Sequence, residues 1–419
     1  MGNKKSGSAI KYLIITIFIV IVNSNAFTQT NDNLSFLSTP TGKYKIGTKE
    51  LFLTDSSRLE KFSKKKPFRK IAIKIWYPAS NEIDPIKEPY LSAYPTNTLY
   101  EIFKSKGVKV PFLDSIKKLK TNSSNCPPIS SDINKFPVLV FSSGYYFGMT
   151  DLYTSILENL ASNGYIICCI THPYEQPYIK FPNNEEIYIN KGKTRLAYLQ
   201  LLITNKLQFR KRNTHKKVEI ITRNILKKLK RFDKALKLWT DDTKFFMNYI
   251  IEKNSDKNDF FNKIDTSKIG VFGHSFGGAV SGQMCKFDKR IKAGLNLDCF
   301  QFGNIIDNPI EVPFMLIQSS NYPDWNLANT IIYENIQSNF YLLSLLNASH
   351  FIFSDAAVIP FENQTIAENF LGKVNGRTTM TTINSYILSF FDLYLKNKSN
   401  QLLEEKLDNN EIKFDFKRH

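Results

Sequence analysis

Short apolar runs that alternate with helical patterns are the main feature of this chain. Each run is bounded by polar or turn residues and has the length of a strand buried on both faces. Such alternation predicts an α/β fold, with a mostly parallel central sheet flanked by helices. The runs are Phe136–Phe141, Tyr165–Ile170, Ile269–Phe272, Ala293–Leu297, Pro313–Gln318 and Phe340–Leu346.

Helices are predicted over Leu152–Asn163, with Gly164 as the C-terminal cap, and over Asn384–Lys396. Before the first buried run, Arg69–Tyr77 alternates partly and is closed by Pro78, which is typical of an antiparallel edge strand. Residues 80–135 contain several Pro and Asn breaks and are predicted to be a loop-rich excursion.

The stretch 194–253 is helical in pattern and strongly basic. Between residues 210 and 237, twelve Lys and Arg residues stand against only Glu219 and Asp233. Apolar residues are interleaved at near-helical spacing. The pattern predicts a helical insertion whose charges form either a solvated face or a lid that contacts anionic lipid.

Composition limits the function classes. With 419 residues, 42% of them hydrophobic, the chain can build a sizeable core, which excludes global disorder. The net charge of +18 is compatible with an anionic membrane surface or nucleic acid, but a Lys-rich, Asn-rich source bias would give the same value. No nucleic-acid recognition motif accompanies the charge, so no nucleic-acid partner is expected.

The N-terminus has the pattern of a secretory signal peptide over residues 1–26. Lys4, Lys5 and Lys11 precede the apolar run Tyr12–Val22, and small residues follow at the cleavage position. The run is too short to span a bilayer comfortably. We therefore expect an exported protein, periplasmic or secreted, with one hydrolase domain over 27–419 that includes the insertion at 194–253.

The five cysteines do not describe a disulfide framework, because their number is odd and their spacing is unpaired. Cys168 and Cys169 fall inside an apolar run and are predicted to be buried. No Cys or His cluster has zinc-ligand spacing. The chain is expected to use neither a metal nor another cofactor.

The most specific motif is Gly273-His274-Ser275-Phe276-Gly277, which ends an apolar run and passes into a helix-compatible run. This is the G-x-S-x-G pattern of a nucleophile elbow, in which a strained turn exposes the serine hydroxyl. Ser275 is therefore predicted to be a catalytic nucleophile. The N–H of Phe276 would then point to where an oxyanion forms.

A serine nucleophile needs a histidine base and an acid, which follow it in the chain order Ser, Asp/Glu, His in this arrangement. Among the five histidines, only His350 follows the serine and also lies just after a predicted strand. The acid is Asp298, which closes the run ending at Leu297, or Asp324, which follows a later strand. A second oxyanion donor is expected in the loop after Phe136–Phe141, where Tyr145 N–H is the candidate.

These residues resemble the plasma-type platelet-activating-factor acetylhydrolases of the α/β-hydrolase superfamily. The resemblance covers most of the chain after residue 40 and includes Pro40–Tyr44, Leu53–Asp55, Ile75–Ala79, Val140–Gly144, Gly273–Ala279, Leu297-Asp298 and Ser349–Asp355. It implies Ser275 as nucleophile, Asp298 as acid, His350 as base, and Tyr145 and Phe276 as oxyanion donors. It also implies hydrolysis, without a metal, of short or oxidised sn-2 acyl groups of phospholipids.

Three departures from that family are visible. Ser143-Gly144 stands where the family usually has His-Gly, which bears on the oxyanion loop. His172-Pro173 stands where it has His-Arg, and the basic helical insertion is longer and more charged than the family leads us to expect; both bear on the substrate. A general carboxylesterase or lipase, and a catalytically silent hydrolase fold that binds anionic membranes, are therefore alternatives. The expected partners are a small-molecule ester or phospholipid and, peripherally, an anionic membrane surface. Hydrophobic access to the serine is expected from Phe147, Phe300, Phe302 and Phe351.

Overall fold

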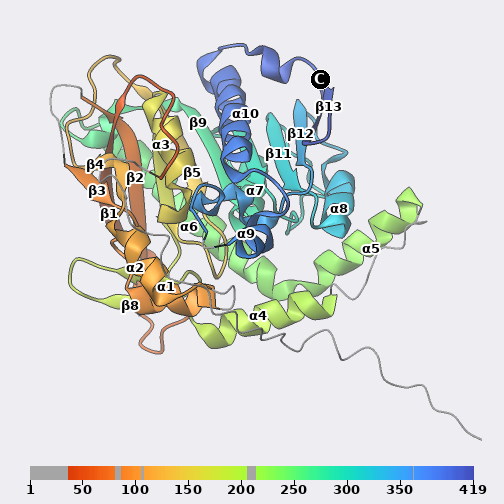
Figure 1. Ribbon diagram of the computed structural model, residues 1–419, viewed down its shortest axis with the longest axis horizontal. Helices are drawn as coiled ribbons and strands as arrows, with labels where there is room; N and C mark the ends of the chain where they lie inside the picture. Colours follow the sequence, from red (N-terminus) through yellow and green to blue (C-terminus); the bar gives the residue numbers. More distant parts are fainter. Residues whose placement is uncertain (1–35, 81–85, 105–107, 205–213, 362) are drawn as a thin grey trace, which may run out of the picture. The chain divides into compact units, whose positions relative to one another are not determined.

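The predicted mostly parallel sheet is confirmed in the computed structural model, which describes residues 36–419 except 81–85, 105–107, 205–213 and 362. Twelve strands form the main sheet, and its centre is six parallel strands in the order β12-β11-β10-β9-β5-β6 (Figure 1). These strands are β5 (Phe136–Ser142), β6 (Ile166–Thr171), β9 (Ile264–His274), β10 (Ile291–Leu297), β11 (Phe314–Ser319) and β12 (Phe340–Leu345). The predicted signal peptide lies outside the described residues.

Further strands extend the sheet on both sides. β2 pairs antiparallel with β6 and β1, so the prediction of an edge strand at Arg69–Tyr77 is wrong. Pro78 is tolerated because the pairing with β6 ends at Trp76, and that ladder does not need the missing N–H. The outer strands are β1 (Lys45–Leu59), β2 (Phe68–Ala79), β3 (Lys87–Pro89), β4 (Lys120–Asn125), β13 (Leu407–Asp408) and β14 (Ile412–Lys417).

The prediction of a loop-rich excursion at 80–135 is also wrong in its central part. The described residues between 87 and 125 include β3, the helices α1 (Thr96–Phe103) and α2 (Val110–Lys118), and β4. Two of the prolines that were taken for breaks start helices instead. Pro95 is the N-cap residue of α1, and a proline occupies the first turn of α2, where an N–H has no intrahelical partner. Buried apolar side chains then tie both helices to the core: Leu99, Ile102, Leu113 and Ile116.

Helices cover both faces of the sheet (Figure 1). One core contains side chains of α3 (Thr154–Ser162) and α10 (Gly376–Lys396). The other contains side chains of α6 (Lys230–Asn254), α7 (Phe276–Phe287) and α8 (Pro323–Tyr333). Trp239 and Phe246 of α6 have no exposed surface, so the second half of the basic stretch builds the core.

The remaining elements surround the ends of the central strands. The first half of the basic stretch forms α4 (Lys191–Thr204) and α5 (His215–Lys228), and β7 (Tyr178–Lys180) pairs with β8 (Glu186–Tyr188). The helix α9 and the short 3₁₀ helices have the following bounds: α9 Gln364–Leu371, η3 Thr150–Tyr153, η4 Phe260–Lys263, η5 His350–Phe353, η6 Asp355–Ala357 and η7 Gln401–Leu403.

Two buried carboxyl groups anchor α3. Asp355 accepts hydrogen bonds of 2.9 Å from the N–H groups of Thr154 and Ser155, and so ties the segment after His350 to the start of α3. Glu158 accepts hydrogen bonds from Asn122 Nδ2 (2.8 Å) and Ser123 Oγ (2.6 Å). Burial raises the pKa of Asp355 to about 6 and that of Glu158 to about 7.

Glu158 makes stability depend on pH. Its pKa is about 7 in the folded chain against an ordinary 4.5, so the folded state binds more protons between these values and becomes less stable as pH rises through them. We expect Glu158→Gln to remove this loss. In urea titrations at pH 5 and pH 8, the drop in unfolding free energy should shrink by about 1–3 kcal/mol in the variant. The same change at exposed Glu252 should leave the drop unaltered; an equal effect there would refute the assignment.

Candidate active site

Ser275 occupies a strained turn between β9 and α7. Its backbone angles are φ 53° and ψ −130°, in the left-handed half of conformational space that a non-glycine residue rarely adopts. The turn is fixed from both sides, since Ser275 N–H donates to Leu297 O (2.8 Å) and Ser275 O accepts from Gly278 N–H (2.8 Å). The serine is therefore held at the carboxyl edge of the parallel strands.

Close backbone packing explains the glycines around this turn. A Cβ atom at Gly277 would overlap the carbonyl oxygen of Ser142, at the end of β5. A Cβ at Gly144 would lie 3.2 Å from Ser275 Cβ. The loop that follows β5 therefore lies directly against Ser275, where the sequence predicted an oxyanion donor.

Asp298 and His350 are brought together by the structure. Asp298 directly follows β10 and has a φ of 56°. Its buried carboxylate accepts hydrogen bonds from Ser319 N–H (2.6 Å) and Ser319 Oγ (2.9 Å). His350 Nδ1 donates to Asp298 Oδ2 over 2.8 Å. This bond fixes the tautomer in which Nε2 of His350 has a free lone pair that can accept a proton.

The competing acid lies elsewhere. Asp324 is in the first turn of α8, and among the described contacts it makes no hydrogen bond to His350. Ser275 Oγ likewise has no hydrogen bond to His350 within the described part of the chain. Such nucleophile–base bonds are often long in unliganded enzymes and tighten when substrate binds.

His274 holds His350 from behind. The two imidazole rings lie 4.4 Å apart, and His274 Nε2 donates to the carbonyl oxygen of His350 (3.0 Å). Nδ1 of His274 must then accept from Tyr153 OH (2.7 Å). Burial, together with the nearby His350, holds the pKa of His274 well below 6.5, so the ring is neutral and keeps this arrangement.

The loop Ser143–Tyr145 is fixed by the turn after β6. Gln176 Nε2 donates to Ser143 Oγ (2.7 Å), and Tyr146 N–H donates to Glu175 O (3.1 Å). The Tyr145 ring packs edge-on against Phe276 with a centroid distance of 5.4 Å. The two residues whose N–H groups were predicted to hold an oxyanion are thus in direct contact.

A buried polar network supports this turn. His172 Nδ1 donates to Asp242 (2.8 Å), and its Nε2 lies 3.5 Å from Ser142 Oγ. Arg69 donates to the same Asp242 carboxylate (2.7 Å), and Trp239 stacks on the imidazole at 3.9 Å. Burial alone would raise the pKa of Asp242, but Arg69 and His172 outweigh it and lower that pKa.

The predicted access residues divide into two pairs. Phe147 and Phe351 lie 6.2 Å apart beside His350 and are only partly buried. Phe300 and Phe302 are 2% and 3% exposed and belong to the core. The prediction of an access role for Phe300 and Phe302 is therefore wrong. Phe302 packs against Phe232 of α6 and Phe276 of α7, and Phe300 packs against Phe302 and Trp325 of α8.

The sequence did not identify the residues that support the site. Ser319 ends β11, Tyr153 ends η3 and Gln176 lies in the turn after β6. No spacing in the sequence marks these three polar residues. The position of His274 inside the G-x-S-x-G motif could have pointed to it, but its hydrogen-bond partners come from segments that are distant in the sequence. Across the described residues, no group of three or more His, Cys, Asp or Glu side chains is placed to hold a metal ion.

Sequence comparison gives a consistent set of relatives. The family model described as platelet-activating factor acetylhydrolase, isoform II matches residues 31–412. The platelet-activating factor acetylhydrolase of Cavia porcellus is 25% identical over 68% of this chain and 64% of its own length. That of Bos taurus is 27% identical over 45% of this chain and 41% of its own. The matches therefore span less than two thirds of either relative.

Among solved structures, a ferulic acid esterase from Streptomyces cinnamoneus matches 90% of this chain and 98% of its own, with a TM-score of 0.67 and 21% identity. At this identity the likeness establishes the fold. The predicted α/β-hydrolase fold is thereby confirmed.

Proposed function

The chain belongs to the platelet-activating factor acetylhydrolase, isoform II family, and we propose that it is a carboxylic ester hydrolase with Ser275 as nucleophile, His350 as base and Asp298 as acid. One observation carries the proposal. The hydrogen bond from His350 Nδ1 to Asp298 leaves Nε2 available at the strand edge where Ser275 is held in its strained turn.

The mechanism follows from these positions. Ser275 Oγ attacks the ester carbonyl while His350 Nε2 takes its proton, and Asp298 stabilises the imidazolium. Phe276 is the first residue of α7, so its N–H has no intrahelical partner and can stabilise the oxyanion together with Tyr145 N–H. His350 returns the proton to the leaving alcohol. Water, deprotonated by His350, then cleaves the acyl-enzyme and restores Ser275.

The substrate we propose is a phospholipid with a short or oxidised sn-2 acyl group. The names of the relatives from Cavia porcellus and Bos taurus support this class. A general carboxylesterase or lipase acting on other acyl esters uses the same machinery and is the alternative. The intact set of Ser275, Asp298 and His350 argues against a catalytically silent fold.

Covalent labelling tests the nucleophile. The purified chain should react with a fluorophosphonate probe and hydrolyse a 2-acetyl phospholipid faster than its long-acyl counterpart. Ser275→Ala should abolish both, and Asp298→Asn should lower kcat about 10³–10⁴-fold by disturbing the histidine tautomer. Ser267→Ala, at an exposed serine on the same strand, should behave as the parent chain.

The outcomes separate mechanism from substrate. Labelling with turnover only of long-chain or simple esters would keep the mechanism and replace the substrate. Labelling that persists in Ser275→Ala would disprove the assignment of the nucleophile. Absence of both labelling and turnover would disprove the enzyme proposal.

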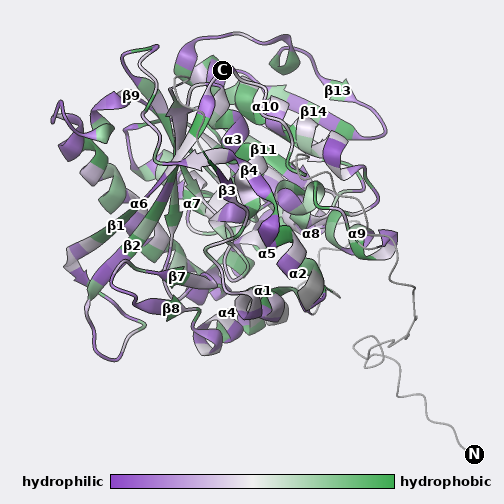
Figure 2. Cartoon of the chain, turned by 60° about the vertical axis from the view of Figure 1, so that its left-hand side comes forward, coloured by the Kyte–Doolittle hydropathy of each residue, from purple (hydrophilic) through white to green (hydrophobic). Residues whose placement is uncertain are grey.

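We also propose that the chain is exported after cleavage near Phe27, on the pattern of residues 1–26, which N-terminal sequencing of the exported protein would check. No helix among the described residues is long and apolar enough to cross a membrane. The surface of α4 supports peripheral contact instead. Leu196 and Leu199 are 48% and 50% exposed, and exposed Lys191, Lys193 and Arg195 precede them in the sequence. Figure 2 shows both hydrophilic and hydrophobic residues on α4.

Vesicle binding tests this contact. Residues three apart lie on one helix face, so Leu196 and Leu199 can enter the interface together while the cations meet anionic head groups. The chain should bind phosphatidylserine-containing vesicles better than pure phosphatidylcholine, and less well as salt rises. The double change Leu196→Asp, Leu199→Asp should weaken binding at least about tenfold. Leu327→Asp, at an exposed position on α8, is the control; equal weakening there would exclude α4 as the contact.

A further inference from the structure

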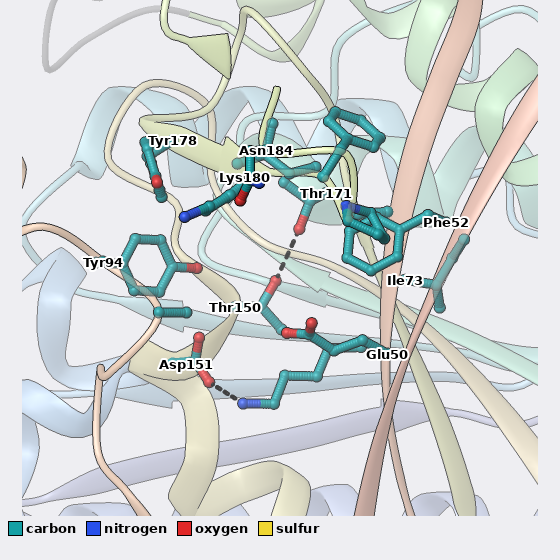
Figure 3. Close-up of a pocket in the computed structure, with 16 residues that line it drawn as sticks. Glu50, Phe52, Ile73, Tyr94, Thr150, Asp151, Thr171, Tyr178, Lys180 and Asn184 are labelled. Carbon is teal, nitrogen blue, oxygen red and sulfur yellow. Dashed lines mark hydrogen bonds and ion pairs between the residues drawn. The ribbon is translucent and has the colours of Figure 1, made fainter. Parts of the chain in front are cut away.

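A cavity with a volume of about 370 Å³, called the second cavity here because it is separate from the serine site, lies beside β7 (Figure 3). Its walls come from β1, β2, the end of β6, and β7 with the turn that follows it. The volume is that of a small-molecule site. Ser275, Asp298 and His350 do not line it.

Part of the cavity wall is internally paired. Lys74 Nζ lies 2.6 Å from Asp151 and 3.6 Å from Glu88, so this ammonium group is already neutralised. Thr150 and Thr171 are hydrogen-bonded to each other at 3.4 Å. These contacts give the wall a fixed shape and leave Asp151 and Lys74 little capacity to attract a charged ligand.

Two exposed side chains of opposite charge in the same wall form no direct ion pair. The carboxylate of Glu50 and the ammonium of Lys180 make neither a hydrogen bond nor an ion pair with any of the described residues, and their attraction to Lys74 and Glu186 acts only at longer range. Glu50 lies opposite Lys74 in the β1–β2 register, but Lys74 is bonded to Asp151. Figure 3 shows the side chains of Glu50 and Tyr94 pointing towards the middle of the cavity, and the side chain of Lys180 running towards Tyr94 and Tyr178.

Apolar and aromatic groups complete the lining. Phe52 and Phe181 pack on each other at 5.5 Å, and the rings of Tyr94 and Tyr178 lie 6.3 Å apart. Aromatic surfaces beside a carboxylate attract organic ammonium groups, because the ring faces are electron-rich and the methyl or methylene groups are apolar. The ammonium of Lys180, which forms no direct ion pair with the described residues, supplies the complement for an oxyanion.

We propose that this cavity binds a small zwitterion, with its ammonium group at Glu50 and the tyrosine rings and its oxyanion at Lys180. The ligand could be the head group of the ester substrate or a free metabolite of the same chemistry. Binding itself does not rest on the proposed hydrolysis, because none of the residues named takes part in it.

Calorimetric titration with phosphocholine is the direct test. The chain should bind phosphocholine more tightly than choline or inorganic phosphate, each of which offers one charge. Glu50→Gln should weaken the binding of phosphocholine and of choline about tenfold. Lys180→Gln should weaken the binding of phosphocholine and leave that of choline unchanged. Lys49→Gln removes one positive charge from the same strand as Glu50 and should change neither affinity, which controls for the net charge of +18.

Several results would overturn the proposal: no phosphocholine binding, binding that neither variant at the cavity weakens, or equal weakening by Lys49→Gln. Thermal unfolding of each variant, unchanged from the parent, verifies the fold. Kinetics then identify the source of the ligand. If the cavity holds the substrate head group, Glu50→Gln raises the KM for a short-acyl phosphatidylcholine and leaves the KM for p-nitrophenyl acetate unchanged. If it holds a free zwitterion, neither KM changes while phosphocholine binding is still weakened.

Discussion

The left-handed turn at Ser275 is the constraint on which the rest of the site depends. Ser275 and Asp298 directly follow the neighbouring strands β9 and β10, with φ values of 53° and 56°. Such a backbone conformation costs of the order of 1–3 kcal/mol at each residue. The packing of the β5 end against Gly277 and the hydrogen bond to Leu297 O hold the first turn in place. The strain turns both side chains away from the sheet at one edge, where a histidine from the segment after β12 can reach them.

A buried charged network, together with the packing of the Tyr145 ring, positions the loop Ser143–Tyr145. The buried Asp242 carboxylate accepts hydrogen bonds from Arg69 and His172. Gln176 accepts a hydrogen bond from the His172 N–H and donates one to Ser143 Oγ, which links this network to the loop. Such a network contributes little net stability, because desolvation offsets the attraction between the charges. Removing one partner is nevertheless strongly destabilising, because it leaves a buried charge uncompensated. It therefore specifies one arrangement of the turn after β6. The hydroxyl of Ser143, at a position where the resemblance implies histidine, accepts the Gln176 hydrogen bond.

The sequence predicted what periodicity and chain order encode. The six central strands, the helices after Leu152 and before Lys396, and the juxtaposition of Asp298 with His350 follow from apolar runs and from the rule that sites gather at strand ends. It failed where local signals are ambiguous. Proline was taken for a break when it started α1 and α2, and β1 was not identified as the strand that covers β2. The supports Ser319, Tyr153 and Gln176 depend on tertiary contacts, which no local pattern records.

One segment, residues 143–153, serves both the serine site and the second cavity. Gly144 lies against Ser275, Asp151 pairs with Lys74 in the cavity wall, and Tyr153 donates to His274, which in turn donates to the carbonyl oxygen of His350. A ligand in the cavity can change the affinity of the serine site only if this segment has two arrangements and the ligand binds one of them better. A ligand at the serine site would then change the affinity of the cavity by the same factor. The segment is held at three points by hydrogen bonds or close packing, and packed contacts of this kind change in discrete steps rather than by gradual deformation. The fold therefore favours two separate binding steps on a rigid segment over a flexible connection between them.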